Sequence, residues 1–378
     1  MAVLSPEANE YLEKAKAFVN SIPLLSPRDI EEAIREEGYI GQDRAVRAVS
    51  LMAYRHIKRL KHIYLMGVKR ESIPEKTNML FVGPTGCGKT YLVEILFKKI
   101  LKLPTVIVDI TGFSETGYVG QDVNSILTRL IYAANMDPIA ASFGIVCIDE
   151  FDKLSSGSNN AVFAGAGTTK DVSGLGVQRE LLKILESTEV PVPLEFSHSD
   201  YTPKVIISTT DIDFIACGAF SGLKGVIEYN KGEHIGFGRR PIGADVDRIA
   251  VNYSIDEVEA ARNFRDYGFL PELIGRFKRI VPFHALSKGE LRKILERNVL
   301  SRYREEFKLE GKRLLIGEEV IGKVVRDSIK KETGARGLEA SLVGILEDAA
   351  FEVFSDPGSS YVKLVLEESS GDISYVIG

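Results

Sequence analysis

A glycine-rich octapeptide, named here the phosphate loop, constrains the fold of this 378-residue chain more than any other segment. Its residues are Gly83, Pro84, Thr85, Gly86, Cys87, Gly88, Lys89 and Thr90. The octapeptide matches the pattern G-x-x-x-x-G-K-[ST], follows the apolar run Met79–Val82 and precedes the helical pattern Thr90–Leu101. Backbone N–H groups of such a turn, together with the N-terminus of the helix, are expected to bind phosphate. An ordinary tight turn between a strand and a helix is the alternative, and the complete match argues against it.

A pair of acidic residues, Asp149 and Glu150, directly follows the apolar run Ile145–Ile148. In the phosphate loop, Lys89 is expected to reach the β- and γ-phosphates of ATP, and Thr90 to bind Mg²⁺. Asp149 is expected to hold the same ion through water, and Glu150 to polarise the attacking water molecule. An acidic pair after a strand is usually a solvated turn, so this interpretation depends on the phosphate loop.

Strand and helix patterns alternate over the first three-quarters of the chain, which is typical of a parallel sheet with helical crossovers. The strand patterns are Met79–Val82, Thr105–Ile110, Ile145–Ile148, Val190–Val192, Lys204–Ser208 and Phe214–Ala216. After Pro282 the patterns are mainly helical, and Ser287–Glu290 has the residues of a capping box. Helices are predicted at Ser287–Leu309, Glu318–Lys331 and Leu338–Phe354, and strands at Arg313–Ile316 and Tyr361–Leu366.

The predicted fold class is therefore α/β, with a large domain around a parallel sheet and a smaller, mostly helical α+β domain after it. The predicted boundaries are an N-terminal helical segment at residues 1–37, the large domain at 38–283 and the small domain at 284–378.

Composition and charge argue against several other classes of protein. The chain has 48 basic and 53 acidic residues, and its net charge of −5 provides no general attraction to nucleic acid or to an anionic membrane. Its three cysteines form no CxxC pair, so neither a disulfide framework nor a zinc site is expected. The polar N-terminus does not resemble a signal peptide, and no apolar stretch reaches the ~18–20 residues of a membrane span. These observations predict a soluble, cytoplasmic protein.

Further short motifs occur along the chain at Tyr39–Gln42, Gly117–Gly120, Asp171–Gly174, Gly218–Phe220, Ile235–Gly238, Pro271–Arg276 and Thr333–Leu338. Together with the phosphate loop and the acidic pair, and in this order, they resemble the ClpX family of AAA+ ATPases from about Ser26 to about Val365. The resemblance implies a P-loop AAA+ domain and a homohexameric ring that uses ATP and Mg²⁺. Such a ring threads unfolded or tagged protein substrates through its pore and delivers them to a ClpP-type peptidase.

The resemblance also implies roles for individual residues. Arg276 matches the arginine finger that reaches the γ-phosphate on the neighbouring subunit, and Arg336 matches a sensor that contacts the nucleotide. Ile40 is implied to flank the adenine ring. The remaining implied residues are Tyr118, Val119, Val162 and Phe163 in the substrate pore, and Ile235, Gly236 and Phe237 in the peptidase-docking loop.

Three departures from the family pattern are visible. The chain has no zinc-binding domain with four cysteines before its first helix, so no zinc is expected. The Arg-Lys-His triple of the family is not matched, because Glu195–Lys204 keeps only His198. The first sensor position, near Cys217, has no strong polar group.

Other functions were weighed against a peptidase-coupled unfoldase. The first alternative is a remodelling chaperone that acts without a peptidase. The Ile235–Phe237 loop discriminates between the two functions, because only the peptidase-coupled unfoldase needs it. A nucleic-acid motor has only the basic stretch Arg55–Lys61 in its favour. A nucleotide switch that does not hydrolyse ATP is disfavoured by Glu150, Arg276 and Arg336 together.

Overall fold

The structure is a computed structural model that describes residues 6–113, 121–155, 174–186, 188–195, 203–230, 261–367 and 370–378. Its contacts divide the chain into two compact units. The first unit comprises residues 1–34, 43–84 and 89–283, and the second comprises residues 35–42, 85–88 and 284–378. Among the described residues, no helix is long and apolar enough to cross a membrane.

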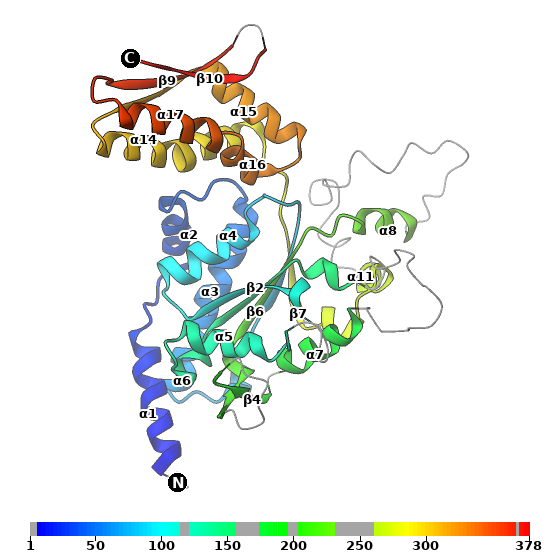
Figure 1. Ribbon diagram of the computed structural model, residues 1–378. Coiled ribbons are helices and arrows are strands. Elements are labelled where there is room, and N and C mark those ends of the chain that lie inside the picture. Colours follow the sequence, from blue (N-terminus) through cyan, green and yellow to red (C-terminus); the bar gives the residue numbers. More distant parts are fainter. Residues whose placement is uncertain are drawn as a thin grey trace. The chain divides into compact units, whose positions relative to one another are not determined.

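A five-stranded parallel sheet forms the centre of the first unit (Figure 1). The alternation of patterns predicted the parallel sheet and four of its strands, but the strand Phe277–Pro282 was not predicted. Its strands are β1 (Asn78–Val82), β2 (Thr105–Asp109), β3 (Ile145–Asp149), β6 (Asp213–Gly218) and β7 (Phe277–Pro282). The strand order is β2-β3-β6-β1-β7, and every neighbouring pair is parallel. All residues of β1 and β6 are buried, which explains their nearly continuous apolar sequences.

Helices and one hairpin complete the first unit. The helices include α1 (Pro6–Ser21), α2 (Pro27–Glu36), α3 (Asp43–Tyr64), α4 (Lys89–Val93), α5 (Ser125–Ala133), α6 (Pro138–Ala141), α7 (Leu175–Leu185), α8 (Leu223–Asn230), α11 (Ala261–Tyr267) and α12 (Pro271–Ile274). The π-helical segment Glu94–Ile100 continues α4, and β4 (Glu189–Pro193) pairs antiparallel with β5 (Lys204–Ser208). The Ser26 hydroxyl accepts a hydrogen bond from the Asp29 amide (3.2 Å), as expected for a residue that caps α2.

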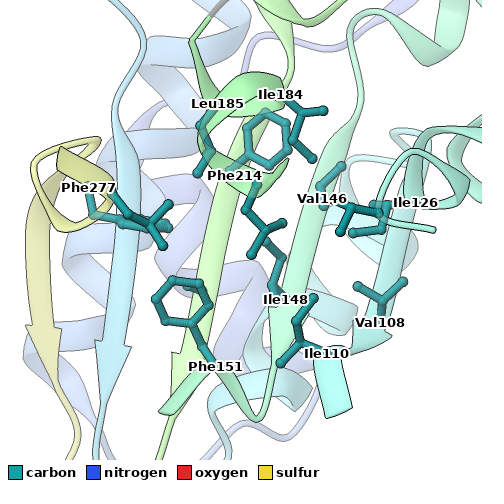
Figure 2. Close-up of a cluster of buried hydrophobic side chains, with 14 of the residues drawn as sticks. Val108, Ile110, Ile126, Val146, Ile148, Phe151, Ile184, Leu185, Phe214 and Phe277 are labelled. Atoms are coloured by element: carbon teal, nitrogen blue, oxygen red, sulfur yellow. The ribbon is translucent and has the colours of Figure 1, made fainter. Parts of the chain in front are cut away.

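One face of the sheet packs against α5 and α7 (Figure 2). Val146 and Ile148 of β3 lie in the same buried cluster as Phe214 of β6, Ile126 of α5 and Ile184 of α7. Successive side chains of a strand point to opposite faces, so the intervening residues of β1, β3 and β6 lie on the other face. Both faces are therefore covered, and the polar groups that matter for function are confined to the ends of the strands.

Helix α3 carries buried polar residues that bind the strand ends opposite to the phosphate loop. His56 Nδ1 lies 3.1 Å from Asp213 Oδ2, and Arg59 lies 3.2 Å from Asp211. The nearby guanidinium groups hold the pKa of the Asp211 carboxyl below its ordinary value, although burial alone would raise it. Lys61 donates a hydrogen bond to the Val19 carbonyl (3.1 Å). Arg59 and Lys61, two cations of the basic stretch Arg55–Lys61, thus bind groups of the protein itself.

The second unit has its own hydrophobic core and a three-stranded sheet. Its helices are α13 (Lys288–Ile294), α14 (Leu300–Leu309), α15 (Glu318–Lys330), α16 (Gly334–Ala340) and α17 (Val343–Ser355), with the π-helical segment Leu295–Val299 between α13 and α14. Its strands are β8 (Arg313–Ile316), β9 (Tyr361–Leu366) and β10 (Ile373–Ile377), in the order β10-β9-β8. The predicted capping box at Ser287 and Glu290 is present.

One expectation for the second unit was wrong, and one strand was not predicted. The single helix predicted over Leu338–Phe354 is two helices, α16 and α17, with Leu342 between them. Leu342 is buried in the core of this unit, so tertiary packing decides where the chain bends. Strand β10 was not predicted, because its short apolar pattern becomes a strand only by pairing antiparallel with β9.

Candidate nucleotide-binding site

The phosphate loop begins where β1 ends, at the carboxyl edge of the parallel sheet, where open α/β sheets bind their ligands. Gly86 and Gly88 adopt positive φ angles of +74° and +93°, which favour glycine. At Gly83, a β-carbon would lie 2.7 Å from Cβ of Phe283, so the backbone there approaches its neighbour too closely for a side chain. These positions explain the glycines in the loop.

Lys89, the first residue of α4, points its ammonium group into the phosphate loop. Its Nζ donates hydrogen bonds to the carbonyls of Gly83 (2.5 Å) and Pro84 (2.8 Å), and the residue is buried. These carbonyls orient the ammonium group, which places the positive charge where a bound phosphate is expected. The predicted role of Lys89 has the local geometry that it requires.

Thr90 and Asp149, the two residues predicted to bind Mg²⁺, lie in direct contact. The Thr90 hydroxyl donates a hydrogen bond to Asp149 Oδ2 (2.8 Å), and Asp149 Oδ1 accepts one from the Glu150 amide (3.0 Å). Hydroxyl and carboxylate oxygens are ligands that Mg²⁺ prefers, and nucleotide phosphates complete such sites. The described residues contain no group of three His, Cys, Asp or Glu side chains that would enclose a metal by itself. Thr90 and Asp149 therefore fit a magnesium ion that is shared with a nucleotide.

Glu150 lies at the end of β3 in a backbone conformation that is unusual for its residue type. Its φ of +55° and ψ of +30° are left-handed, a strain of the order of 1–3 kcal/mol that is often found at functional sites. Burial is the main cause that raises the pKa of the Glu150 carboxyl, and the charges of Asp152 and Asp149 add to it. A carboxylate with a raised pKa is a stronger proton acceptor, as a residue that activates water should be.

Asp152 is a residue of the site whose individual role the sequence did not reveal. It is buried, and its Oδ1 accepts a hydrogen bond from the amide of Ala219 (3.1 Å), just after β6. Asp152 thereby links the segment after β3 to the segment after β6. The sequence shows that Asp152 lies two residues after Glu150, which could have suggested a role in the site. It does not show the hydrogen bond, because Ala219 is 67 residues away in sequence.

We expect Asp152→Asn to move the acid limb of the ATPase pH profile to lower pH. The Asp152 charge raises the pKa of Glu150, so its removal lowers that pKa, and Glu150 stays ionised at lower pH. The asparagine oxygen can still accept the Ala219 hydrogen bond. The measurement is kcat/KM for ATP against pH, which reports groups of the free enzyme. Asp109→Asn is the matched control, because Asp109 has the smallest of the cited effects on Glu150. Equal shifts in both variants would argue against a specific effect of Asp152.

The Tyr39–Gln42 segment is held close to the phosphate loop within the second unit. The Tyr39 hydroxyl donates a hydrogen bond to the carbonyl of Gly88 (3.1 Å), and Gln42 Nε2 donates one to that of Cys87 (3.4 Å). Ile40, between them, is partly exposed. The segment expected to flank adenine thus lies beside the loop, and the roles of Tyr39 and Gln42 were not predicted.

The segment that carries Arg336 also contacts the phosphate loop within the second unit. The amide of Ala335 donates a hydrogen bond to the carbonyl of Gly86 (3.0 Å), and a β-carbon on Gly86 would collide with the carbonyl of Thr333. Arg336 follows directly, on the first turn of α16, and is exposed. The structure thus brings the proposed sensor segment to the loop.

Arg276 lies at the other end of the sheet from the phosphate loop. Asn78, the first residue of β1, donates a side-chain hydrogen bond to the Arg276 carbonyl (3.2 Å). Gly83 directly follows β1 and is five residues after Asn78, a distance of ~16 Å for a strand. This separation exceeds the length of an arginine side chain, so Arg276 does not share a site with Lys89 of the same chain.

The three cysteines are buried and free. Cys147 Sγ lies 3.8 Å from Cys217 Sγ, and burial raises the pKa of the Cys217 thiol well above its ordinary value. Cys217 therefore offers no charged group at the first sensor position. The residues predicted for the pore and for peptidase docking, namely Tyr118, Val119, Val162, Phe163, Ile235, Gly236 and Phe237, lie outside the described residues.

Comparisons with known proteins agree with this site. Residues 74–280 match the model of the AAA domain (Cdc48 subfamily). Over 341 residues, the chain is 36% identical to "ATP-dependent Clp protease ATP-binding subunit ClpX" of Treponema denticola, covering 88% of this chain and 78% of that protein. The residues matched by the AAA domain model include the phosphate loop, the acidic pair and Arg276. The protein is an ATPase, and it belongs to the ClpX family of AAA+ ATPases.

Proposed function

We propose that this ATPase unfolds protein substrates, threads them through the pore of a ring and delivers them to a ClpP-type peptidase. The observation that carries the proposal is the arrangement of Thr90, Asp149 and Glu150 beside the phosphate loop, with Arg276 at the far end of the same sheet. The first three residues fit hydrolysis of ATP within one chain. The distance of Arg276 from the phosphate loop supports the further proposal that it acts on the nucleotide of a second subunit.

Hydrolysis is assigned to the phosphate loop and the acidic pair. The phosphate loop and Lys89 bind the phosphates, and Glu150 accepts a proton from the attacking water. Mg²⁺, when bound by Thr90 and Asp149, neutralises charge on the phosphates. The left-handed backbone and raised pKa of Glu150 support its assignment as the base.

Assembly into a ring is proposed from the family resemblance, and the position of Arg276 supports it. An arginine that cannot reach Lys89 of its own chain contributes to hydrolysis only at the nucleotide of a neighbour. Arginine suits this task, because its planar guanidinium keeps its charge at every accessible pH and binds phosphate oxygens in pairs. A homohexameric ring in which each subunit supplies Arg276 to the next is the proposed assembly.

Work on the substrate is assigned to two segments by family resemblance. Tyr118 and Val119 stand between two glycines and offer an apolar surface that suits any unfolded or tagged chain. Val162 and Phe163 are assigned to a second pore loop. Ile235-Gly236-Phe237 is assigned to docking in apolar clefts of the peptidase, where burial of Phe237 contributes about 1.5–3 kcal/mol per site before the cost of ordering the loop.

We expect Phe237→Ala to abolish association with a ClpP-type peptidase while ATP hydrolysis and ring assembly stay normal. Several weak docking sites on one ring act together through effective concentration, so a loss at every site is amplified. The measurement is recovery of the peptidase in a pull-down with ATP, alongside ATPase rate and particle mass by sedimentation.

Ile206→Ala is the matched control, because Ile206 is another large apolar side chain, 69% exposed, on β5. The control should recover as much peptidase as the wild type. Equal recovery with Phe237→Ala, or none with the wild type, contradicts peptidase docking through this loop. The second result would favour a remodelling chaperone that acts without a peptidase.

A further inference from the structure

Glu186, the residue that follows α7, forms an ion pair with Arg276. Arg276 Nη2 lies 2.5 Å from Glu186 Oε1, and both side chains are partly exposed, at 44% and 42%. Exposed ion pairs typically contribute only ~0–1 kcal/mol to stability. Stability is therefore a weak explanation for this pair, and its geometry suggests another one.

Both partners are carried by backbone that buried amide side chains fix in place. Asn78 is buried and bonds to the Arg276 carbonyl and, through Oδ1, to the amide of Phe214 (3.0 Å). Gln178 of α7 is also buried; its Nε2 donates a hydrogen bond to the carbonyl of Gly268 (3.2 Å), and its Oε1 accepts one from the amide of Leu270 (2.8 Å). Helix α7, which leads to Glu186, is thus fastened to the segment that leads to Arg276.

The electrostatic setting of Glu186 also favours a specific role. A negative charge at the C-terminus of a helix is unfavourable, because the last carbonyl groups carry partial negative charge. Lys183, the cation in the last turn of α7, forms an ion pair with Glu180 (2.6 Å). Arg276 forms the ion pair that compensates the charge of Glu186, and an acid at this place orients the guanidinium in return.

The pair leaves Arg276 able to bind phosphate. A guanidinium has five N–H donors in a fixed plane, and the hydrogen bond to Glu186 uses one of them, at Nη2. The carboxylate therefore restricts the rotation of the side chain while the other donors remain available to an anion. Such restriction reduces the cost of ordering the arginine when a neighbouring subunit presents its nucleotide.

We propose that Glu186 is a positioning residue for Arg276, which it orients toward the nucleotide of the neighbouring subunit. The inference rests on the proposed function, in which Arg276 acts between subunits. Glu186 does not touch the nucleotide itself, and its effect is transmitted through the guanidinium. The effect is on the rate of hydrolysis and not on the affinity of the phosphate loop for ATP.

The test is steady-state ATP hydrolysis by assembled rings of Glu186→Ala and Glu186→Gln. For Glu186→Ala we expect kcat to fall about tenfold with KM for ATP unchanged, because a misplaced group loses rate without affecting ground-state binding. Glu186→Gln keeps an oxygen that accepts the hydrogen bond, so we expect it to recover part of the rate. Glu180→Gln is the matched control on the same helix and should leave kcat unchanged.

A double-substitution cycle separates positioning from a general effect on the fold. If Glu186 acts through Arg276, adding Glu186→Ala to Arg276→Ala causes no further loss of kcat. Additive losses, an altered KM, or a normal kcat in Glu186→Ala rings contradict the positioning role. A normal kcat in Arg276→Ala alone contradicts the proposed function itself, so the two failures give different results.

Discussion

Glu150→Gln is expected to lower kcat for ATP hydrolysis by about 10²–10⁴ while ATP still binds. Glutamine keeps the size of the side chain but cannot accept the proton of the attacking water. In the binding part of the site, Thr90 keeps its hydrogen bond to Asp149, and Lys89 keeps its hydrogen bond to the Gly83 carbonyl. The measurements are ATPase rate and ATP affinity, the latter by equilibrium binding of a fluorescent ATP analogue.

The stability of this variant provides an internal control. The folded protein raises the pKa of Glu150, so its ionised form is disfavoured in the fold and destabilises it at pH values above that pKa. Replacement by neutral glutamine removes this penalty, and Tm at neutral pH should stay the same or rise. A lower Tm with lost binding would indicate unfolding, and a nearly normal kcat would show that Glu150 is not the base.

Arg276→Ala is expected to lower kcat by about 10³–10⁵ if Arg276 contributes as arginine fingers do in related nucleotide hydrolases. Lys89→Ala rings should be inactive for a different reason, since their phosphate loop lacks its cation. When the two variants are mixed into joint rings, part of the activity should return. An Arg276→Ala subunit has an intact phosphate loop and can receive Arg276 from a Lys89→Ala neighbour.

Arg279→Ala is the matched control for this experiment, because Arg279 is an exposed arginine on the same strand, β7. It should have nearly normal kcat, and mixing it with Lys89→Ala should give no more activity than dilution of the wild type gives. Full hydrolysis by assembled Arg276→Ala rings would place the finger elsewhere. Failure of the mixture to regain activity would argue against action between subunits.

The nucleotide motifs could be predicted from the sequence because each is local. The phosphate loop binds through the backbone of consecutive residues, and its glycines record the positive φ angles at Gly86 and Gly88. Asp149 and Glu150 end a strand whose apolar run is visible in any one sequence. Parallel strands place their carboxyl ends at one edge, so the contact of Thr90 with Asp149 followed from the order of the motifs.

The second unit shows where local patterns were insufficient. The apolar spacing over Leu338–Phe354 fits one helix, but burial of Leu342 favours a bend between α16 and α17. Strand β10 was not predicted, and it forms its ladder by pairing with β9. In both cases the deciding contact is with residues outside the segment: Leu342 packs in the core of the unit, and β10 pairs with β9.

The sequence by itself thus determined four strands of the parallel sheet, the phosphate loop and the acidic pair, since each of these is a run of consecutive residues, whereas strand β7 was not predicted. Only the tertiary structure decided the partners of polar side chains: Asp152 with Ala219, Tyr39 with Gly88, and Glu186 with Arg276. These partners are 49 to 90 residues apart, and no periodicity or spacing encodes such pairs. A side chain reaches them only after the core has brought the ends of strands and helices together.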